Sequence, residues 1–171
     1  MQDKKDEARF QYRLFAEANP TNPTGCEQLL GTTFPDSIDL TISVCEEALS
    51  YIPDQPQFYF YLGLGEYMKD NYEKALEVYR KGVEYVDEKN KSLLSDFYGQ
   101  MGDLYYHMEK TDRALIIYDK ALEYNPNKLG VLNNYSYFLS VAKKDLPRAE
   151  RMSSITIKAD PANPTYLDTY G

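Results

Sequence analysis

The sequence predicts an all-α protein, a solenoid of antiparallel helix pairs stacked along the chain. Two observations support this fold class. Apolar residues recur at steps of three and four over most of the 171 residues, so each helix would carry them on one stripe. Small residues at equivalent positions also return at a nearly constant interval, because Thr41, Ala75, Ala114 and Ala149 lie 34, 39 and 35 residues apart. That interval is typical of arrays in which each helix pair packs on the next.

The clearest helix pair spans residues 57–86. Its apolar stripe runs through two helices, and residues 69–71 are expected to form the turn between them. Gly63 and Ala75 allow the two backbones to approach closely, while Tyr79 supplies the bulk beside them. This series of aromatic, Leu-Gly, Tyr and Ala landmarks resembles the tetratricopeptide repeat. The resemblance implies a right-handed superhelical solenoid of antiparallel helix pairs.

The same landmarks divide the chain into six segments. The first resembles the second helix of a leading repeat, because Ala8 and Tyr12 stand where Ala75 and Tyr79 stand in the clearest pair. The longer interval before Ala114 predicts an extra turn on the helix that follows the clearest pair. The segments are 4–20 (second helix of a truncated leading repeat), 22–55 (a degenerate repeat with its second helix at 38–51), 56–94, 95–128 and 129–162 (three repeats), and 163–171 (the start of a further first helix).

The first and last segments are incomplete repeats. Together with the resemblance, they favour a piece of a longer bacterial array of tetratricopeptide repeats. Arrays of this kind need polar capping helices, so helix faces left uncovered at the two ends would promote self-association.

Composition and charge limit the function classes. Hydrophobic residues make up 43% of the chain and aromatic residues 14%, which is enough for a packed core. The formal net charge of −8 disfavours nucleic-acid binding, which depends on clustered Lys and Arg. No apolar run reaches membrane-spanning length, and the first residues contain no apolar signal core. We therefore expect a soluble protein without membrane insertion, cytoplasmic or, if its parent is exported, periplasmic.

Catalysis, a metal site and a cofactor are not expected. His107 is the only histidine, so neither a histidine-based catalytic set nor a metal-ligand spacing can be assembled around it. The pair Gly63 and Gly65 lies inside a helical pattern rather than at a strand-to-helix turn, which favours helix packing over dinucleotide binding. Cys26 and Cys45 lack the CxxC spacing, and two thiols are favoured over a disulfide.

The resemblance implies a concave groove lined by the first helix of each repeat, a surface with which such proteins bind peptides or helices. Mapping the family's groove positions onto this chain gives a set of candidate peptide-binding residues. They are Gln57, Phe60, Leu64, Tyr67, Met68, Asp96, Asp103, Tyr106, His107, Asn133 and Tyr137, with Asp168 behind the last of them. Tyr67 and Tyr106 are equally compatible with packing inside a repeat.

These residues define the expected ligand. Phe60, Leu64 and Tyr137 are apolar although neighbouring residues already fill the packing stripe, which is typical of a binding surface. Family members that grip a C-terminal carboxylate do so with basic residues and Asn at positions where this chain has apolar residues and Asp103. The ligand is therefore expected to be a protein or peptide with apolar or aromatic anchors, and Asp96 and Asp103 favour a basic residue beside them. The alternative is a structural role, as a self-association or spacer module of a larger multi-repeat protein.

Overall fold

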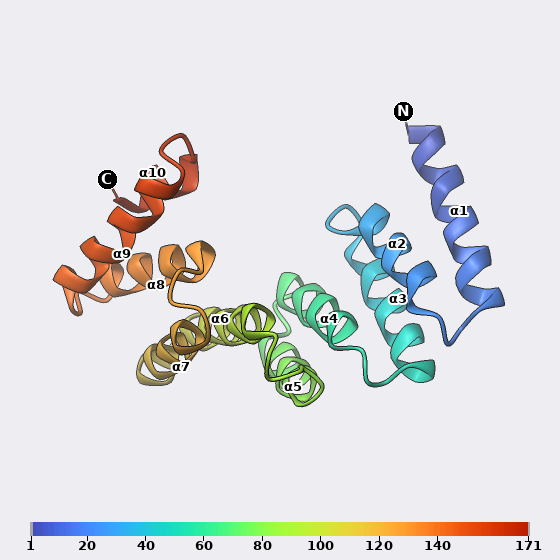
Figure 1. Cartoon of the computed structure of the whole chain (residues 1–171), viewed down its shortest axis with the longest axis horizontal. Coiled ribbons are helices and arrows are strands. Elements are labelled where there is room, and N and C mark those ends of the chain that lie inside the picture. The colour runs from blue at the N-terminus through green and yellow to red at the C-terminus, as the bar shows by residue number, and fades with distance from the viewer. Residues whose placement is uncertain (1, 171) are drawn as a thin grey trace. The chain divides into compact units, whose positions relative to one another are not determined.

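The computed structural model describes residues 2–170, and all regular secondary structure in this range is α-helical (Figure 1). The helices are α1 (Gln2–Ala18), α2 (Pro23–Thr33), α3 (Ile38–Tyr51), α4 (Pro56–Met68), α5 (Tyr72–Glu84), α6 (Lys91–His107), α7 (Thr111–Tyr124), α8 (Leu129–Val141), α9 (Leu146–Ala159) and α10 (Pro164–Tyr170). The chain divides into two compact units, one with α1–α5 that ends at Val86 and one with α6–α10 that begins at Asp87. The predicted all-α fold class is confirmed.

In the first unit, each helix packs on the next, from α1 to α5. Proline begins two of these helices, Pro23 in α2 and Pro56 in α4, where its missing N–H has no helical partner to lose. Asn22 caps α2, because its side-chain oxygen accepts from the backbone N–H of Thr24 at 3.0 Å. The core between these helices contains both cysteines as buried thiols, next to fully buried residues such as Phe58.

Glycine and tyrosine pair in the same way in both units. A Cβ atom on Gly63 of α4 would lie 2.2 Å from Cε1 of Tyr79, and one on Gly102 of α6 would lie 2.8 Å from Cδ1 of Tyr118. Both tyrosines are almost completely buried. Gly63 is therefore a site of close helix approach, as the sequence predicted.

In the second unit, α6 pairs with α7, α8 pairs with α9, and α10 packs on α8 and α9. Helix α6 has 17 residues where α4 has 13, so the longer repeat interval is taken up by extra helix, as expected. Asn90 caps this extension by accepting from the backbone N–H of Leu93 at 3.2 Å. No helix within residues 2–170 is long and apolar enough to cross a bilayer.

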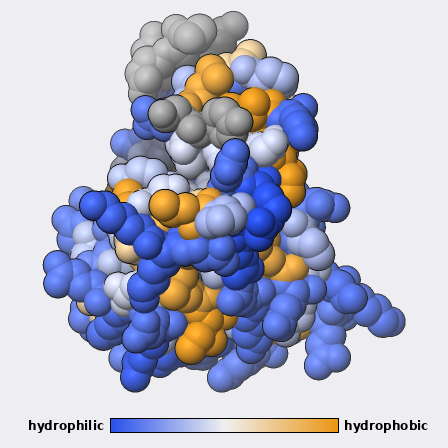
Figure 2. Space-filling view, turned by 90° about the vertical axis from the view of Figure 1, so that its left-hand side faces the viewer, coloured by the Kyte–Doolittle hydropathy of each residue, from blue (hydrophilic) through white to orange (hydrophobic). Residues whose placement is uncertain are grey.

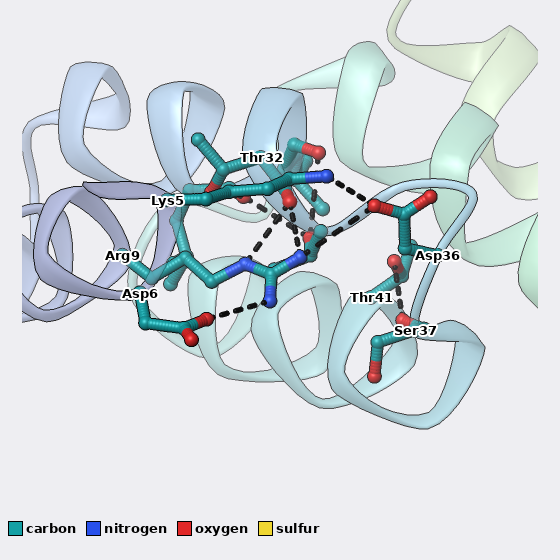
Figure 3. A network of polar contacts seen from close by, with 10 residues as sticks. Lys5, Asp6, Arg9, Thr32, Asp36, Ser37 and Thr41 are labelled. Atoms are coloured by element: carbon teal, nitrogen blue, oxygen red, sulfur yellow. Dashed lines mark hydrogen bonds and ion pairs between the residues drawn. The ribbon is translucent and has the colours of Figure 1, made fainter. Parts of the chain in front are cut away.

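A polar network attaches α1 to the connection between α2 and α3 (Figure 3). Nε of Arg9 donates to the carbonyl oxygen of Thr32 at 3.0 Å, at the C-terminal end of α2. This carbonyl lies in the last turn, where no helical N–H is available and a cation interacts favourably with the helix dipole. Asp36 pairs with Lys5 and lies 3.9 Å from the Arg9 guanidinium. The hydrogen bond from Lys5 lowers the pKa of the Asp36 carboxyl, so this anchor stays charged at neutral pH.

Candidate peptide-binding surfaces

In the first unit, the candidate residues lie on α4. Gln57 and Met68, at its two ends, are exposed, while Phe60, Leu64 and Tyr67 are half-buried. The ring of Phe60 lies 5.9 Å from that of Tyr79 in α5, and the ring of Tyr67 lies 5.9 Å from that of Tyr72. Phe60 and Tyr67 thus contribute to the packing of α4 on α5 in addition to any contact with a ligand.

In the second unit, the candidate residues lie on α6 and α8, two first helices that pack against each other. A Cβ atom on the buried Gly99 would lie 2.8 Å from Cγ2 of Val131, so the absence of a side chain allows this close approach. Asp103, Tyr106 and His107 of α6, with Asn134 and Tyr137 of α8, lie along this junction and retain at least partial exposure. We call these five residues the α6–α8 surface.

Asp103 connects three helices of the second unit. Its carboxylate accepts a hydrogen bond from the Tyr118 hydroxyl of α7, and Nδ2 of Asn134 in α8 lies 3.1 Å from each of its oxygens. Burial raises the pKa of Asp103 to about 6, although the hydrogen bonds from Tyr118 and Asn134 oppose this shift. Among the described residues, no lysine or arginine forms an ion pair with it. At neutral pH, Asp103 is an anionic group without a counter-charge.

Asp96 differs from Asp103 in this respect. Its carboxylate lies 2.7 Å from Nζ of Lys128, which also donates to the Ser92 hydroxyl at 3.1 Å. The positive charge of Lys128 therefore compensates the negative charge of Asp96. The two aspartates that the sequence placed in one groove are therefore electrostatically unequal.

Asn133 is buried in the structure, whereas the next residue, Asn134, is exposed. Asn133 is only 5% exposed, while Asn134 lies at the surface and binds Asp103. Successive residues of a helix are rotated by about 100°, so the two side chains point to different surroundings. We therefore replace Asn133 by Asn134 in the candidate surface.

Aromatic residues share the helix faces of Asp103 and Asn134, because Tyr106 follows Asp103 by three residues on α6 and Tyr137 follows Asn134 by three residues on α8. Tyr106 packs edge-on against Phe138 of α8, with ring centroids 4.7 Å apart, and the exposed His107 packs edge-on against Tyr106 at 5.6 Å. Tyr137 is 48% exposed. This surface combines one uncompensated carboxylate with accessible aromatic rings.

Other apolar side chains of the second unit are more dispersed. Val141, Leu146 and Leu167 are each about half exposed. Figure 2 faces the part of the molecule that carries α8–α10 and shows separate apolar patches divided by hydrophilic side chains. The described part of the chain contains no cluster of three or more His, Cys, Asp or Glu residues that could hold a metal ion.

The helix pairs and the packing of successive first helices define the class: a helical-repeat protein. A family model described as "Tetratricopeptide repeat" matches residues 95–128, which cover most of α6 and all of α7. Residues 95–128 thus match a tetratricopeptide repeat, the family that the sequence resembles. No curated protein matches the sequence significantly.

Solved structures agree with this fold. The crystal structure of MamA is 17% identical with a TM-score of 0.73, and the match covers 94% of this chain and 91% of that one. TTC0263, a thermophilic tetratricopeptide-repeat protein of Thermus thermophilus, is 15% identical with a TM-score of 0.74. The match covers 99% of this chain and 90% of TTC0263. YrrB, described as "a TPR protein with an unusual peptide-binding site", is 17% identical with a TM-score of 0.66. The match covers 93% of this chain and 79% of YrrB.

Proposed function

We propose that the chain is a non-catalytic protein–protein interaction module that binds a peptide or helix of a partner on the α6–α8 surface. The observation that carries this proposal is Asp103, a carboxylate that shares its surface with accessible aromatic side chains and has no cationic partner among the described residues. The partner segment carries a lysine or arginine next to apolar residues.

The charge of Asp103 is the reason to expect a lysine or arginine in the ligand. A partly desolvated carboxylate without a counter-charge is unfavourable, and a cationic ligand group would recover part of that free energy through a charge-assisted hydrogen bond. Asn134 and Tyr118 hold the carboxylate in place before the ligand arrives. Such preorganisation reduces the entropy lost on binding.

The aromatic rings are the reason to expect apolar residues beside this cation. Tyr137 and Tyr106 offer large contact areas with few rotatable bonds, a property of side chains that dominate binding interfaces. In the first unit, Leu64 and Met68 on α4 offer further apolar contacts for the same class of ligand, and Gln57 offers a polar one. The description of the similar YrrB structure as peptide-binding supports this assignment.

Selection from a peptide library displayed on phage tests the proposal. Immobilised wild-type protein should enrich peptides with Lys or Arg beside apolar residues. Tyr137→Ala and Asp103→Asn should weaken binding of a selected peptide, whereas Asp112→Asn should not, because that carboxylate is 90% exposed and paired with Lys144. Equal binding to all four proteins would refute the α6–α8 surface.

The structural alternative rests on a different observation. Phe10, Leu14 and Phe15 of α1 are 61%, 45% and 42% exposed, which leaves apolar side chains open to a second chain. Self-association through α1 should appear as a concentration-dependent mass in light scattering that Phe10→Ser with Leu14→Ser removes. A monomer at all concentrations would exclude it.

A further inference from the structure

The first unit contains a cavity that the proposed function does not use. It lies between α3, α4 and α5 and has a volume of about 460 Å³. Its lining combines apolar and charged side chains. The apolar ones include Leu49, Leu62 and Val78, and the charged ones are Glu46, Glu77, Lys74 and Lys81. We call this cavity the α3–α5 notch.

The second unit shows what the equivalent position can hold. By the repeat interval, Glu46 of α3 and Lys74 of α5 correspond to Asp119 of α7 and Arg148 of α9. Nη2 of Arg148 lies 2.5 Å from Oδ1 of Asp119, and its Nη1 lies 3.1 Å from the hydroxyl of Tyr135 in α8. The guanidinium also stacks over the Tyr135 ring, 4.8 Å from its centroid. In this unit, an arginine of the chain itself occupies the space between the two second helices.

The first unit lacks such an arginine. Lys74 stands at the equivalent position and pairs with two carboxylates: its Nζ lies 2.6 Å from Oε1 of Glu66 in α4 and 3.6 Å from Oε1 of Glu46. Burial raises the pKa of Glu66, but the hydrogen bonds from Lys74 and Asn71 outweigh it, and the net shift is downward. Glu66 thus stays ionised and shares Lys74 with Glu46. The second unit has Leu139 at the position of Glu66, so Arg148 has no competing acid on α8.

A second difference enlarges the notch. Leu62 stands where the second unit has Tyr135, so the ring that supports Arg148 is replaced by a smaller side chain. The smaller side chain and the closer pairing of Lys74 with Glu66 together leave a cavity between α3 and α5.

We propose that the α3–α5 notch binds an arginine side chain of a partner protein. The guanidinium of this arginine pairs with Glu46 and Glu77, as Arg148 pairs with Asp119, and its aliphatic stem lies on Leu49 and Val78. Arginine fits because its planar group can bind two carboxylates while its stem covers apolar surface.

The charges around the notch agree with a cationic ligand. Glu66 neutralises Lys74, and the ammonium of Lys81 lies over the ring of Tyr59, 5.6 Å from its centroid. The two lysines belong to the lining together with Glu46 and Glu77. Because Glu66 is also ionised and pairs with Lys74, three carboxylates stand against two ammonium groups, and the negative charges are in excess. The notch is separate from the α6–α8 surface, since its lining residues belong to the first unit alone.

A titration followed by 15N–1H NMR tests this site on the whole chain. The probe is the peptide acetyl-Leu-Arg-Leu-amide, and acetyl-Leu-citrulline-Leu-amide is its uncharged match. The arginine peptide should shift the amides around Leu49, Leu62 and Val78, and the citrulline peptide should not. Glu46→Gln with Glu77→Gln should weaken binding about fivefold or more, because two exposed ion pairs are lost. Glu123→Gln, an exposed acid of α7, should leave it unchanged.

The outcomes that overturn the proposal are distinct. Equal shifts with the citrulline peptide would mean that the charge plays no part, and unchanged affinity in the double glutamine variant would place the peptide elsewhere. Shifts confined to α6 and α8 would assign the peptide to the α6–α8 surface and leave the notch without a ligand. Both glutamate side chains are on exposed residues, so the double variant should fold normally.

Discussion

Replacing Asp103 by asparagine should stabilise the protein at neutral pH. Burial raises the pKa of this carboxyl from 3.8 to about 6. Between those two values the native state holds a proton that the unfolded chain has lost, so the free energy of unfolding falls as the pH rises through this window. Above this pH window, the ionised carboxylate lowers the free energy of unfolding by at most about 3 kcal/mol relative to the neutral form.

Asparagine has nearly the same shape and carries no charge. Its side-chain oxygen can accept from Tyr118 and Asn134, as the carboxylate does. Its amide N–H groups need an acceptor, which a rotated Asn134 side chain can supply, and this rearrangement offsets part of the gain. We expect Asp103→Asn to raise the free energy of unfolding by about 1–2 kcal/mol near pH 7.5 and by little near pH 5.

Urea denaturation followed by circular dichroism, at several pH values between about 4 and 8, measures the free energy of unfolding and its dependence on pH. The wild-type protein should lose stability as the pH rises through the window, and the variant should lose less. Asp112→Asn, which removes an exposed carboxylate, should keep the wild-type slope. A variant that is less stable than wild type near pH 7.5, or that keeps the wild-type slope, would refute the argument.

Two further substitutions, each with a control, test the close approach of α4 and α5 and the cap that Arg9 forms at the C-terminal end of α2. Gly63→Ala should destabilise the protein by about 1–3 kcal/mol, because its Cβ would overlap the tyrosine ring of α5. Gly31→Ala, where nothing lies within 4 Å of the added Cβ, should be neutral or slightly stabilising, and equal effects of the two substitutions in urea melts would contradict the close approach. Arg9→Gln should lower the free energy of unfolding by about 1–2 kcal/mol, since it removes the guanidinium contacts to Thr32 and the acidic groups beside it. Arg13→Gln removes only exposed ion pairs and should cost less than about 1 kcal/mol, so a larger loss than for Arg9→Gln would argue against the cap.

Much of the fold followed from local sequence features. The helix expected at 38–51 is α3, and the turn expected at 69–71 separates α4 from α5. Periodic apolar residues, prolines at helix starts and a glycine opposite a tyrosine act over one or two turns of helix. Their effects can therefore be recognised without knowledge of distant residues.

The candidate site could be predicted only in part. The family positions led to α4, α6 and α8, and Asp103 and Tyr137 are accessible there. The same mapping selected Asn133, which is buried, instead of Asn134, because a rotation of one residue decides which side chain faces a neighbouring helix.

The sequence by itself determined the helices and their pairing. The tertiary structure decided which charges are compensated. Lys128 pairs with Asp96 while Asp103 has no cation among the described residues, and Glu66 holds Lys74 while Arg148 turns to Asp119. Most of these partners lie on different helices, and most of the pairs join residues that are far apart in sequence. The electrostatic state of each group thus depends on the distance to residues from other helices and on the water excluded between them, and neither is encoded in a local pattern.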